Sequence, residues 1–296
     1  MKILVTGASG FIGRALSRHL LAGGHRVRGL IRQADEGGVP AGAEIVVGDL
    51  LDPSSLDRAA QGMEAVVHLA CATGVARESV ARAVNVEGTR SLLAAAARGG
   101  ARRFVFLSSV SARRRRMGPY GRTKREGEAL VSASAFEWVI LRPSLVYGPG
   151  PDGLFARLAR ALRTLPVVPV IGDGRLPIDP LDVGDLCLVI EQCLLRGDVA
   201  GKSYDVLGPE RMSFDEMLRR LGASLGASPR LLHVPPAIAL ALARLLGALL
   251  ARPPLSEDNV LGMISPADVD GEPVRRDFAI SWTRLDDGLE RLKSAA

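Results

Sequence analysis

Residues 1–16, MKILVTGASGFIGRAL, join a short apolar run to three regularly spaced glycines, Gly7, Gly10 and Gly13. Between a strand and a helix, glycines at this spacing allow a tight turn, a close approach of backbone to a pyrophosphate, and close packing of the helix on the strand. The N-terminus of such a helix adds N–H groups and a positive dipole. The segment therefore predicts a unit that binds a dinucleotide.

Strand-like and helical segments alternate through the first half of the chain. Apolar runs predict strands at residues 2–7, 25–32, 44–50, 65–70 and 103–109, and helical spacing predicts helices at 11–24, 54–61 and 85–100. The runs VVHLA and FVFLS are almost continuously apolar, which is typical of parallel strands buried on both faces. Repeated units of this kind predict an α/β fold with a doubly wound parallel sheet, a Rossmann fold.

Proline-rich connections such as LPVVPV and RLPIDP become frequent after residue 144. We expect a nucleotide-binding domain over residues 1–143, to which residues 171–195 and 203–208 return. Residues 144–296 are expected to form mainly a smaller, interleaved substrate-binding part.

The composition excludes several classes of protein. Of 296 residues, 47% are hydrophobic and 24% charged, which suits a globular core. Three widely spaced cysteines and four scattered histidines predict neither a disulfide framework nor a metal site. The net charge of +6 comes without a nucleic-acid-binding motif, so no nucleic-acid partner is expected. No secretory signal fits before the first strand, and we expect a cytoplasmic protein.

A second motif, YGRTK, places Tyr120 and Lys124 four residues apart, on one face of a predicted helix. A phenol with a pKa near ~10 is a poor base at neutral pH, and a nearby ammonium favours its ionised form. We therefore expect Lys124 to lower the pKa of Tyr120 and make it a general acid/base. The run FVFLSS ends shortly before this motif, so Ser109 could hydrogen-bond the same substrate oxygen.

The segments TGASGFIG, GDLLDPSSL, VVHLA, VNVEGT, FVFLSS, PYGRTK and LRPSLVYGPG follow one another in this order. Together they resemble the extended branch of the short-chain dehydrogenase/reductase superfamily, which contains NAD(P)-dependent epimerases, dehydratases and reductases. The sequence pattern as a whole is most similar to that of an atypical group of this superfamily, which resembles the accessory Rossmann subunit of respiratory complex I.

The resemblance implies roles for individual residues. Tyr120 matches the acid/base, Lys124 the lysine that binds the nicotinamide ribose, and Ser109, rather than Ser108, the active-site serine. Asn85 matches an asparagine that shapes the active site, and we include it in the catalytic set. The residues expected to bind the cofactor are Gly7, Gly10, Phe11, Ile12, Gly13, Arg32, Asp49, Leu50, Leu69, Ala70, Tyr120, Lys124, Pro143 and Val146.

Two departures from the family pattern refine these expectations. Relatives that use NAD usually have an acidic residue at the end of the second strand, where this chain has Ile31 followed by Arg32. An arginine there suits a 2′-phosphate, so we favour NADP, with NAD possible through Asp35 or Glu36. Sugar-nucleotide dehydratases carry Thr-Asp-Glu where this chain has Ser109-Val110-Ser111, which disfavours that reaction.

Two further segments allow more than one interpretation. Residues 113–116 are four consecutive arginines, which suit either a solvated loop or the recruitment of an anionic substrate. Residues 237–252 are rich in alanine and leucine, and would reach only ~24 Å as a helix, too short to span a membrane. They suit a packed helix, a lid over an apolar substrate or a helix lying on a membrane surface.

The favoured function is an NADP-linked oxidoreductase that acts on a small carbonyl or hydroxyl compound, either anionic or apolar, as a monomer or homodimer. The alternatives are a non-catalytic NAD(P)-binding sensor or assembly subunit and, less favoured, a nucleotide-sugar epimerase.

Overall fold

A computed structural model describes residues 1–33, 38–74, 77–150, 154–251 and 253–294. Seven parallel strands form the main sheet, in the order β11-β6-β5-β4-β1-β2-β3. Their bounds are β1 Lys2–Thr6, β2 Arg26–Ile31, β3 Glu44–Val47, β4 Ala65–His68, β5 Arg103–Leu107, β6 Glu137–Pro143 and β11 Lys202–Val206. The predicted doubly wound parallel sheet is confirmed.

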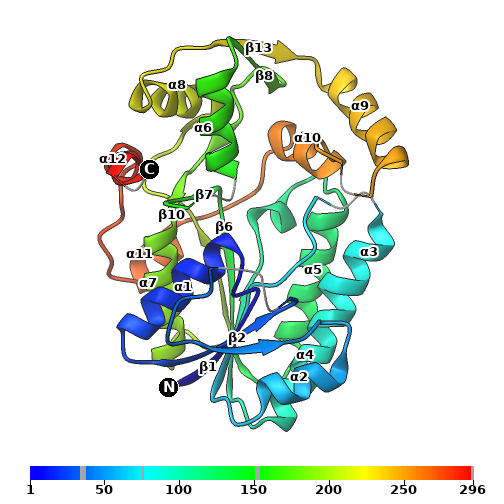
Figure 1. Ribbon diagram of the computed structural model, residues 1–296, viewed down its shortest axis with the longest axis vertical. Helices are drawn as coiled ribbons and strands as arrows, with labels where there is room; N and C mark the ends of the chain where they lie inside the picture. Colours follow the sequence, from blue (N-terminus) through cyan, green and yellow to red (C-terminus); the bar gives the residue numbers. More distant parts are fainter. Residues whose placement is uncertain (34–37, 75–76, 151–153, 252, 295–296) are drawn as a thin grey trace.

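Helices cover both faces of this sheet (Figure 1). On one face lie α1 (Phe11–Ala22), α7 (Val183–Leu195) and α11 (Glu272–Asp277). On the other lie α2 (Pro53–Ala60), α4 (Gly88–Arg98) and α5 (Pro119–Ser132). Strands β4 and β5 are buried along their whole length, which explains their continuous apolar sequence.

The strand order reverses between β1 and β4, which are neighbours in the sheet but far apart in the sequence. The chain leaves β1 toward one face and β4 toward the other, so a crevice opens at the carboxyl ends of these two strands. In open parallel sheets this is where ligands bind. Gly7 and Leu69, both predicted to contact a cofactor, follow directly on β1 and β4.

The remaining elements form an upper part above the sheet in Figure 1. Its helices are α6 (Leu154–Thr164), α8 (Phe214–Ser224), α9 (Pro236–Leu249), α10 (Glu257–Ile264) and α12 (Leu285–Ser294). Strand β8 (Val167–Ile171) pairs with β13 (Arg230–Val234). The short pairs are β7 (Val146–Tyr147) with β10 (Leu181–Asp182), and β9 (Pro177–Ile178) with β12 (Met212–Ser213). A helix α3 (Glu78–Arg82), a π-helical turn at Ala83–Glu87 and a 3-10 turn at Val110–Arg113 complete the fold.

The segments expected to return to the sheet differ in where they pack. Helix α7 packs against α1 and β11 pairs with β6, but Ile171 and Ile178 pack with the hydrophobic clusters of the upper part. Helix α11 also returns to the sheet, where Val274 and Phe278 are buried beside β11. The reason is that Ile171 is the last residue of β8, which pairs with β13, and Pro177 and Ile178 form β9, which pairs with β12. The division into two domains remains a prediction.

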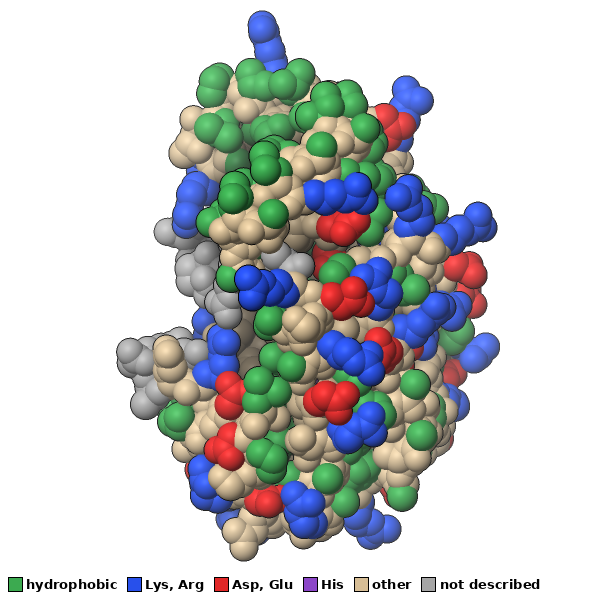
Figure 2. All heavy atoms as spheres, turned by 90° about the vertical axis from the view of Figure 1, so that its right-hand side faces the viewer, with side chains coloured by type: hydrophobic (Ala, Val, Ile, Leu, Met, Phe, Trp, Pro, Cys, Tyr) green, Lys and Arg blue, Asp and Glu red, His purple; other side chains and the backbone are tan. Residues whose placement is uncertain are grey.

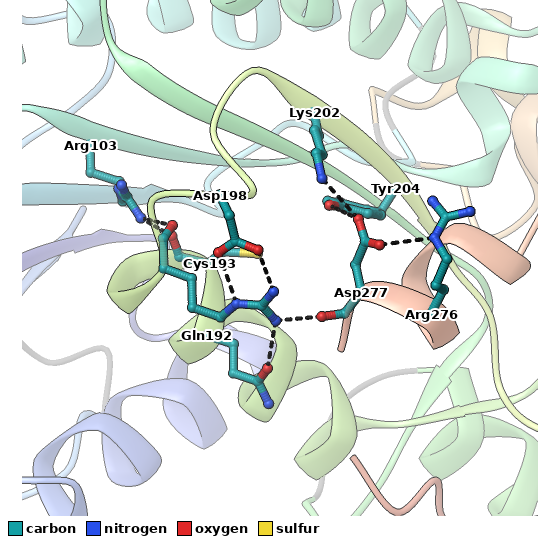
Figure 3. Close-up of polar contacts among 9 residues, drawn as sticks. Arg103, Gln192, Cys193, Asp198, Lys202, Tyr204, Arg276 and Asp277 are labelled. Atoms are coloured by element: carbon teal, nitrogen blue, oxygen red, sulfur yellow. Dashed lines mark hydrogen bonds and ion pairs between the residues drawn. The ribbon is translucent and has the colours of Figure 1, made fainter. Parts of the chain in front are cut away.

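Arg103 joins β5 to the end of α7 (Figure 3). Its side chain is buried and donates from Nη1 to the carbonyl of Cys193 at 2.8 Å and to that of Arg196, while Nη2 pairs with Glu137.

A second group of contacts surrounds Asp277, which accepts hydrogen bonds from the Tyr204 hydroxyl at 2.7 Å and from the Lys202 ammonium at 3.1 Å. The hydrogen bond from Tyr204 is the main cause that lowers the pKa of Asp277 to about 2. These contacts fasten α7 and α11 to the sheet.

Helix α9 confirms that the alanine- and leucine-rich segment is helical. It packs on α10 with Ala239 and Ala243 buried, whereas Ile238, Leu245 and Leu249 are exposed. Figure 2, in which the right-hand side of Figure 1 faces the viewer, shows hydrophobic side chains gathered on the upper part of the molecule. No helix among the described residues is long and apolar enough to cross a membrane.

Candidate active site

The turn after β1 requires glycine for steric reasons. Gly7 has a φ of +71°, and a Cβ atom there would lie 2.9 Å from the backbone nitrogen of Ala70. A Cβ on Gly13 would lie 2.1 Å from the carbonyl oxygen of Gly7, so only glycine lets α1 start this close to β1. Gly10 is the N-cap of α1, and no side chain caps the helix there. The N-terminal N–H groups of α1 thus remain available to a phosphate.

A cavity of about 610 Å³ opens at the carboxyl ends of the strands, beside this turn. All the predicted site residues except Asn85 line it: Gly7, Gly10, Phe11, Ile12, Gly13, Arg32, Asp49, Leu50, Leu69, Ala70, Ser109, Tyr120, Lys124, Pro143 and Val146. The structure therefore brings segments from six different strand ends together around one cavity of a size typical for a small-molecule or cofactor site. Their roles toward a cofactor or substrate remain predictions.

Asn85 lies behind the cavity wall. Its side chain accepts a hydrogen bond from the backbone N–H of Ala72 at 2.7 Å, and donates to the carbonyl of Ala72 and to the hydroxyl of Thr123. It is buried and stands in the π-helical turn, a form of helix frequent at functional sites. Asn85 therefore ties the loop after β4 to α5, the helix that carries Tyr120, and its membership of the catalytic set stays a prediction.

The three remaining residues of the predicted catalytic set meet at one end of the cavity. Tyr120 is the second residue of α5, and its side chain is hydrogen-bonded to that of Ser109, which follows β5. Lys124 is one turn further along α5 and buried, with its ammonium 2.7 Å from the carbonyl oxygen of Leu107. The neighbouring Ser108 donates instead to Glu128 on α5.

The expected effect of Lys124 on the pKa of Tyr120 stays a prediction. Burial is the largest influence on the phenol and raises its pKa, the charge of Cys71 raises it further, and only the hydrogen bond with Ser109 lowers it. The Lys124 ammonium lies 6.0 Å from the centre of the Tyr120 ring and is directed toward the Leu107 carbonyl. Burial therefore favours the protonated form of Tyr120, in which it can donate a proton.

Asp258, on α10 of the upper part, holds the start of α5. Its carboxylate accepts hydrogen bonds from the backbone N–H of Tyr120 at 3.1 and 3.2 Å and from that of Gly121. Burial raises the pKa of this carboxyl, while the two backbone donors lower it. A Cβ at residue 118 would lie 2.2 Å from the carboxylate, so Gly118 leaves it room. No signal in the sequence indicated this residue.

The other end of the cavity contains the residues that bear on cofactor choice. Ile31 ends β2 and is buried, and Arg32, next to it, is exposed and lines the cavity. The Asp49 carboxylate accepts from the backbone N–H of Leu51 at 2.9 Å. Asp35 and Glu36, the acidic residues that could serve NAD, lie outside the described residues.

His68 is packed in the sheet beside the site. Its ring nitrogens are hydrogen-bonded to the hydroxyls of Thr6 and Thr89, at 2.7 and 3.0 Å. Burial, followed by the charge of Lys124, lowers its pKa to about 3, so the ring is neutral. Within the described part of the chain, no group of three or more His, Cys, Asp or Glu side chains could hold a metal ion.

Comparison of the sequence with known proteins identifies a family for this chain. The model of the NAD-dependent epimerase/dehydratase family matches residues 3–206. The chain belongs to this family. It is 31% identical to a 2-alkyl-3-oxoalkanoate reductase of Stenotrophomonas maltophilia, over the whole of this chain and 99% of the relative. It is 33% identical to a ceramide reductase of Caulobacter vibrioides, over 79% of this chain and 73% of the relative.

Solved structures share the fold. The dTDP-glucose 4,6-dehydratase DesIV of Streptomyces venezuelae, with NAD bound, superposes with a TM-score of 0.81 at 24% identity, over the whole of this chain and 96% of the other. A UDP-glucose 4-epimerase of Thermus thermophilus, in complex with NAD, gives a TM-score of 0.80 at 23% identity, over the whole of both chains. The protein is thus an enzyme of a family that contains NAD(P)-dependent reductases, epimerases and dehydratases.

Proposed function

We propose that this enzyme reduces the ketone of an apolar 3-oxo compound, with NADPH as the hydride donor. The observation that carries the proposal is the arrangement of Ser109, Tyr120 and Lys124 around a cavity that continues into a second, mainly apolar one. The relative that matches the whole chain is a reductase of 2-alkyl-3-oxoalkanoates, which supports a ketone with apolar substituents.

The cavity suits a dinucleotide. The close approaches at Gly7 and Gly13 leave a hollow that any Cβ would fill, and the uncapped N-terminus of α1 faces it. Lys124 and Arg32 both line this cavity. In this proposal Lys124 holds the ribose of the nicotinamide end and Arg32 binds a 2′-phosphate, which is the basis for favouring NADPH over NADH. When bound, NADPH supplies the hydride that the carbonyl carbon accepts.

The protein residues provide the proton and hold the substrate oxygen. The hydroxyls of Ser109 and Tyr120 can both donate to the ketone oxygen, which polarises the carbonyl. As the carbon accepts the hydride, the oxygen gains negative charge and takes the proton of the Tyr120 phenol, so that the product is a neutral alcohol. The raised pKa of Tyr120 suits this direction because the phenol begins the reaction protonated.

The test is a titration of the purified protein with NADPH and with NADH, followed by a screen of 2-alkyl-3-oxo compounds in which oxidation of the nicotinamide is followed by its absorbance. We expect tighter binding of NADPH and consumption of one NADPH per ketone reduced. Tight NADPH binding without reduction of any ketone would favour a sensor, and conversion of a nucleotide sugar without net change in the nicotinamide would favour an epimerase.

A further inference from the structure

A second cavity, of about 230 Å³, adjoins the first at Ser109 and Ser144. It lies between the 3-10 turn at Val110–Arg113, strand β9 and residues 262–269. Most of its wall is apolar: Val110, Leu145, Leu176, Pro177, Ile178, Leu207, Phe214, Met263, Pro266, Ala267 and Val269. A substrate whose ketone lies at Ser109 would therefore extend its apolar substituents into this second cavity.

The charged residues that line the second cavity are Arg114, Asp179 and Arg211. Arg211 is neutralised by Asp179, to which its guanidinium donates two hydrogen bonds, at 2.9 and 3.2 Å. Arg114 has no carboxylate within ion-pairing distance among the described residues. Among the described residues, the wall thus carries one positive charge, that of Arg114, without a carboxylate partner.

The guanidinium of Arg114 is also short of hydrogen-bond acceptors. Nη1 donates to the carbonyl oxygen of Ser265, and the backbone of Arg114 pairs with that of Ala267, so the side chain is fixed against residues 265–267. Its Nε is sealed from solvent and has no acceptor within the described ranges. Burial lowers the pKa of this guanidinium, but an arginine remains charged in a protein. An unpaired charge in the wall of an apolar cavity is costly, and an anion in the cavity that pairs with the guanidinium relieves that cost.

The neighbouring arginines are placed differently. Arg113 is exposed and donates to the carbonyl of Asp268 at 3.0 Å, and Arg115 and Arg116 are exposed as well. Among the four arginines of the run, Arg114 is the member that lines the cavity. The run therefore provides its own control, because Arg115 has the same charge and lies one residue away.

We propose that Arg114 binds the carboxylate of an apolar acid whose hydrocarbon part occupies the second cavity. The proposal rests on the function given above, of which it specifies the substrate class: an oxo acid rather than a neutral ketone, ester or sugar. Arg114 donates to the carboxylate and so fixes the substrate with its ketone oxygen toward Ser109 and Tyr120. The apolar side chains of the second cavity recognise the rest of the molecule.

Equilibrium binding tests this without requiring catalysis. We would measure by calorimetry, in the presence of saturating NADP⁺, the binding of octanoate and of octanamide, which share a chain but differ in charge. Because hydrogen bonds to charged groups are stronger than those to neutral groups, the wild-type protein should bind octanoate about 10- to 100-fold more tightly. Arg114→Met should bind both equally, Arg114→Lys should keep part of the preference, and Arg115→Met should behave as the wild type.

Equal binding of octanoate and octanamide by the wild type would overturn the proposal, as would a preference for octanoate that survives in Arg114→Met. The wild-type comparison is decisive even where a variant fails to fold. A preference for octanoate in a protein that reduces no ketone would uphold Arg114 as an acid-binding residue while contradicting the proposed reduction, so the two failures are distinct.

Discussion

At the scale of single residues, the protonation state of Tyr120 determines what the site can do. The spacing of Tyr120 and Lys124 correctly predicts that they share a helix face, but the spacing does not reveal where the ammonium points. In the structure it points to the carbonyl of Leu107, and burial keeps the phenol protonated. If Tyr120 is the acid/base, we therefore expect it to give a proton to a developing alkoxide more readily than it removes one from an alcohol.

This protonation state predicts a pH dependence. A pKa raised above the ordinary value of about 10 means that the phenol stays protonated through neutral and mildly alkaline solution. The rate of ketone reduction at saturating NADPH should therefore not fall between about pH 6 and pH 9. Stopped-flow measurements across this range would check it, and a decline with an apparent pKa near 7 would show that Lys124 does lower the pKa of Tyr120.

Arg32 carries the prediction about cofactor choice. If it binds a 2′-phosphate, Arg32→Ala should weaken NADPH binding about 10-fold or more and leave NADH binding unchanged, because NADH has a hydroxyl at that position. Fluorescence titration with both cofactors measures this. Arg26→Ala, which removes an exposed arginine at the opposite end of β2, is the matched control. Equal losses for NADPH and NADH in Arg32→Ala would contradict the assignment.

At the scale of elements, α5 is held in place by a residue from another part of the chain. Asp258 accepts from the first backbone N–H groups of α5, so it satisfies donors that a helix leaves unpaired and adds a negative charge where the helix dipole favours one. Because Tyr120 is in this first turn, Asp258 on α10 of the upper part helps to fix the position of the phenol.

Asp258→Ala should therefore lower both stability and turnover. Loss of a cap of this type costs about 0.5–2 kcal/mol, measurable by urea unfolding. We expect kcat to fall while the KM for NADPH changes little, and Asp258→Asn, which retains an oxygen acceptor, to recover most of kcat. A variant that is less stable but has an unchanged kcat would show that Asp258 stabilises the fold without positioning Tyr120.

Arg103 provides a second prediction for an element, the C-terminal end of α7. Replacing its charged hydrogen bonds to the carbonyls of Cys193 and Arg196 in Arg103→Met should cost about 2–4 kcal/mol of unfolding free energy, since buried acceptors and Glu137 lose their partner. Arg102→Met, at the exposed neighbouring position, should cost little. Equal, small effects of the two substitutions in urea unfolding would contradict this view of α7.

The sequence predicted the features that are determined by residues close to one another along the chain. The turn at Gly7, the buried strands β4 and β5 and the helix carrying Tyr120 and Lys124 follow from local spacing and hydrophobic runs. Asp258 could not be predicted, because it is 138 residues from Tyr120 and contacts it only through tertiary structure. The second cavity was hidden for the same reason, since its wall comes from separate segments between residues 109 and 269.

At the scale of the whole molecule, the two cavities differ in the groups that line them. The first, at the carboxyl ends of the strands, presents backbone N–H groups and cations suited to a dinucleotide, and the second presents an apolar wall with one unbalanced charge. They share Ser109 and Ser144, and Tyr120 lines the first cavity on the same side. The hydride donor and the ketone would thus meet where Ser109 and Tyr120 can bind the oxygen.

The most direct test is single-turnover oxidation of NADPH by a 2-alkyl-3-oxo acid, in the wild-type protein and in Tyr120→Phe. If Tyr120 gives the proton, the substitution should slow hydride transfer about 10²- to 10⁴-fold and leave the dissociation constant of NADPH unchanged. A Tyr120→Phe protein that reduces the ketone at the wild-type rate would contradict the assignment of Tyr120 as the acid.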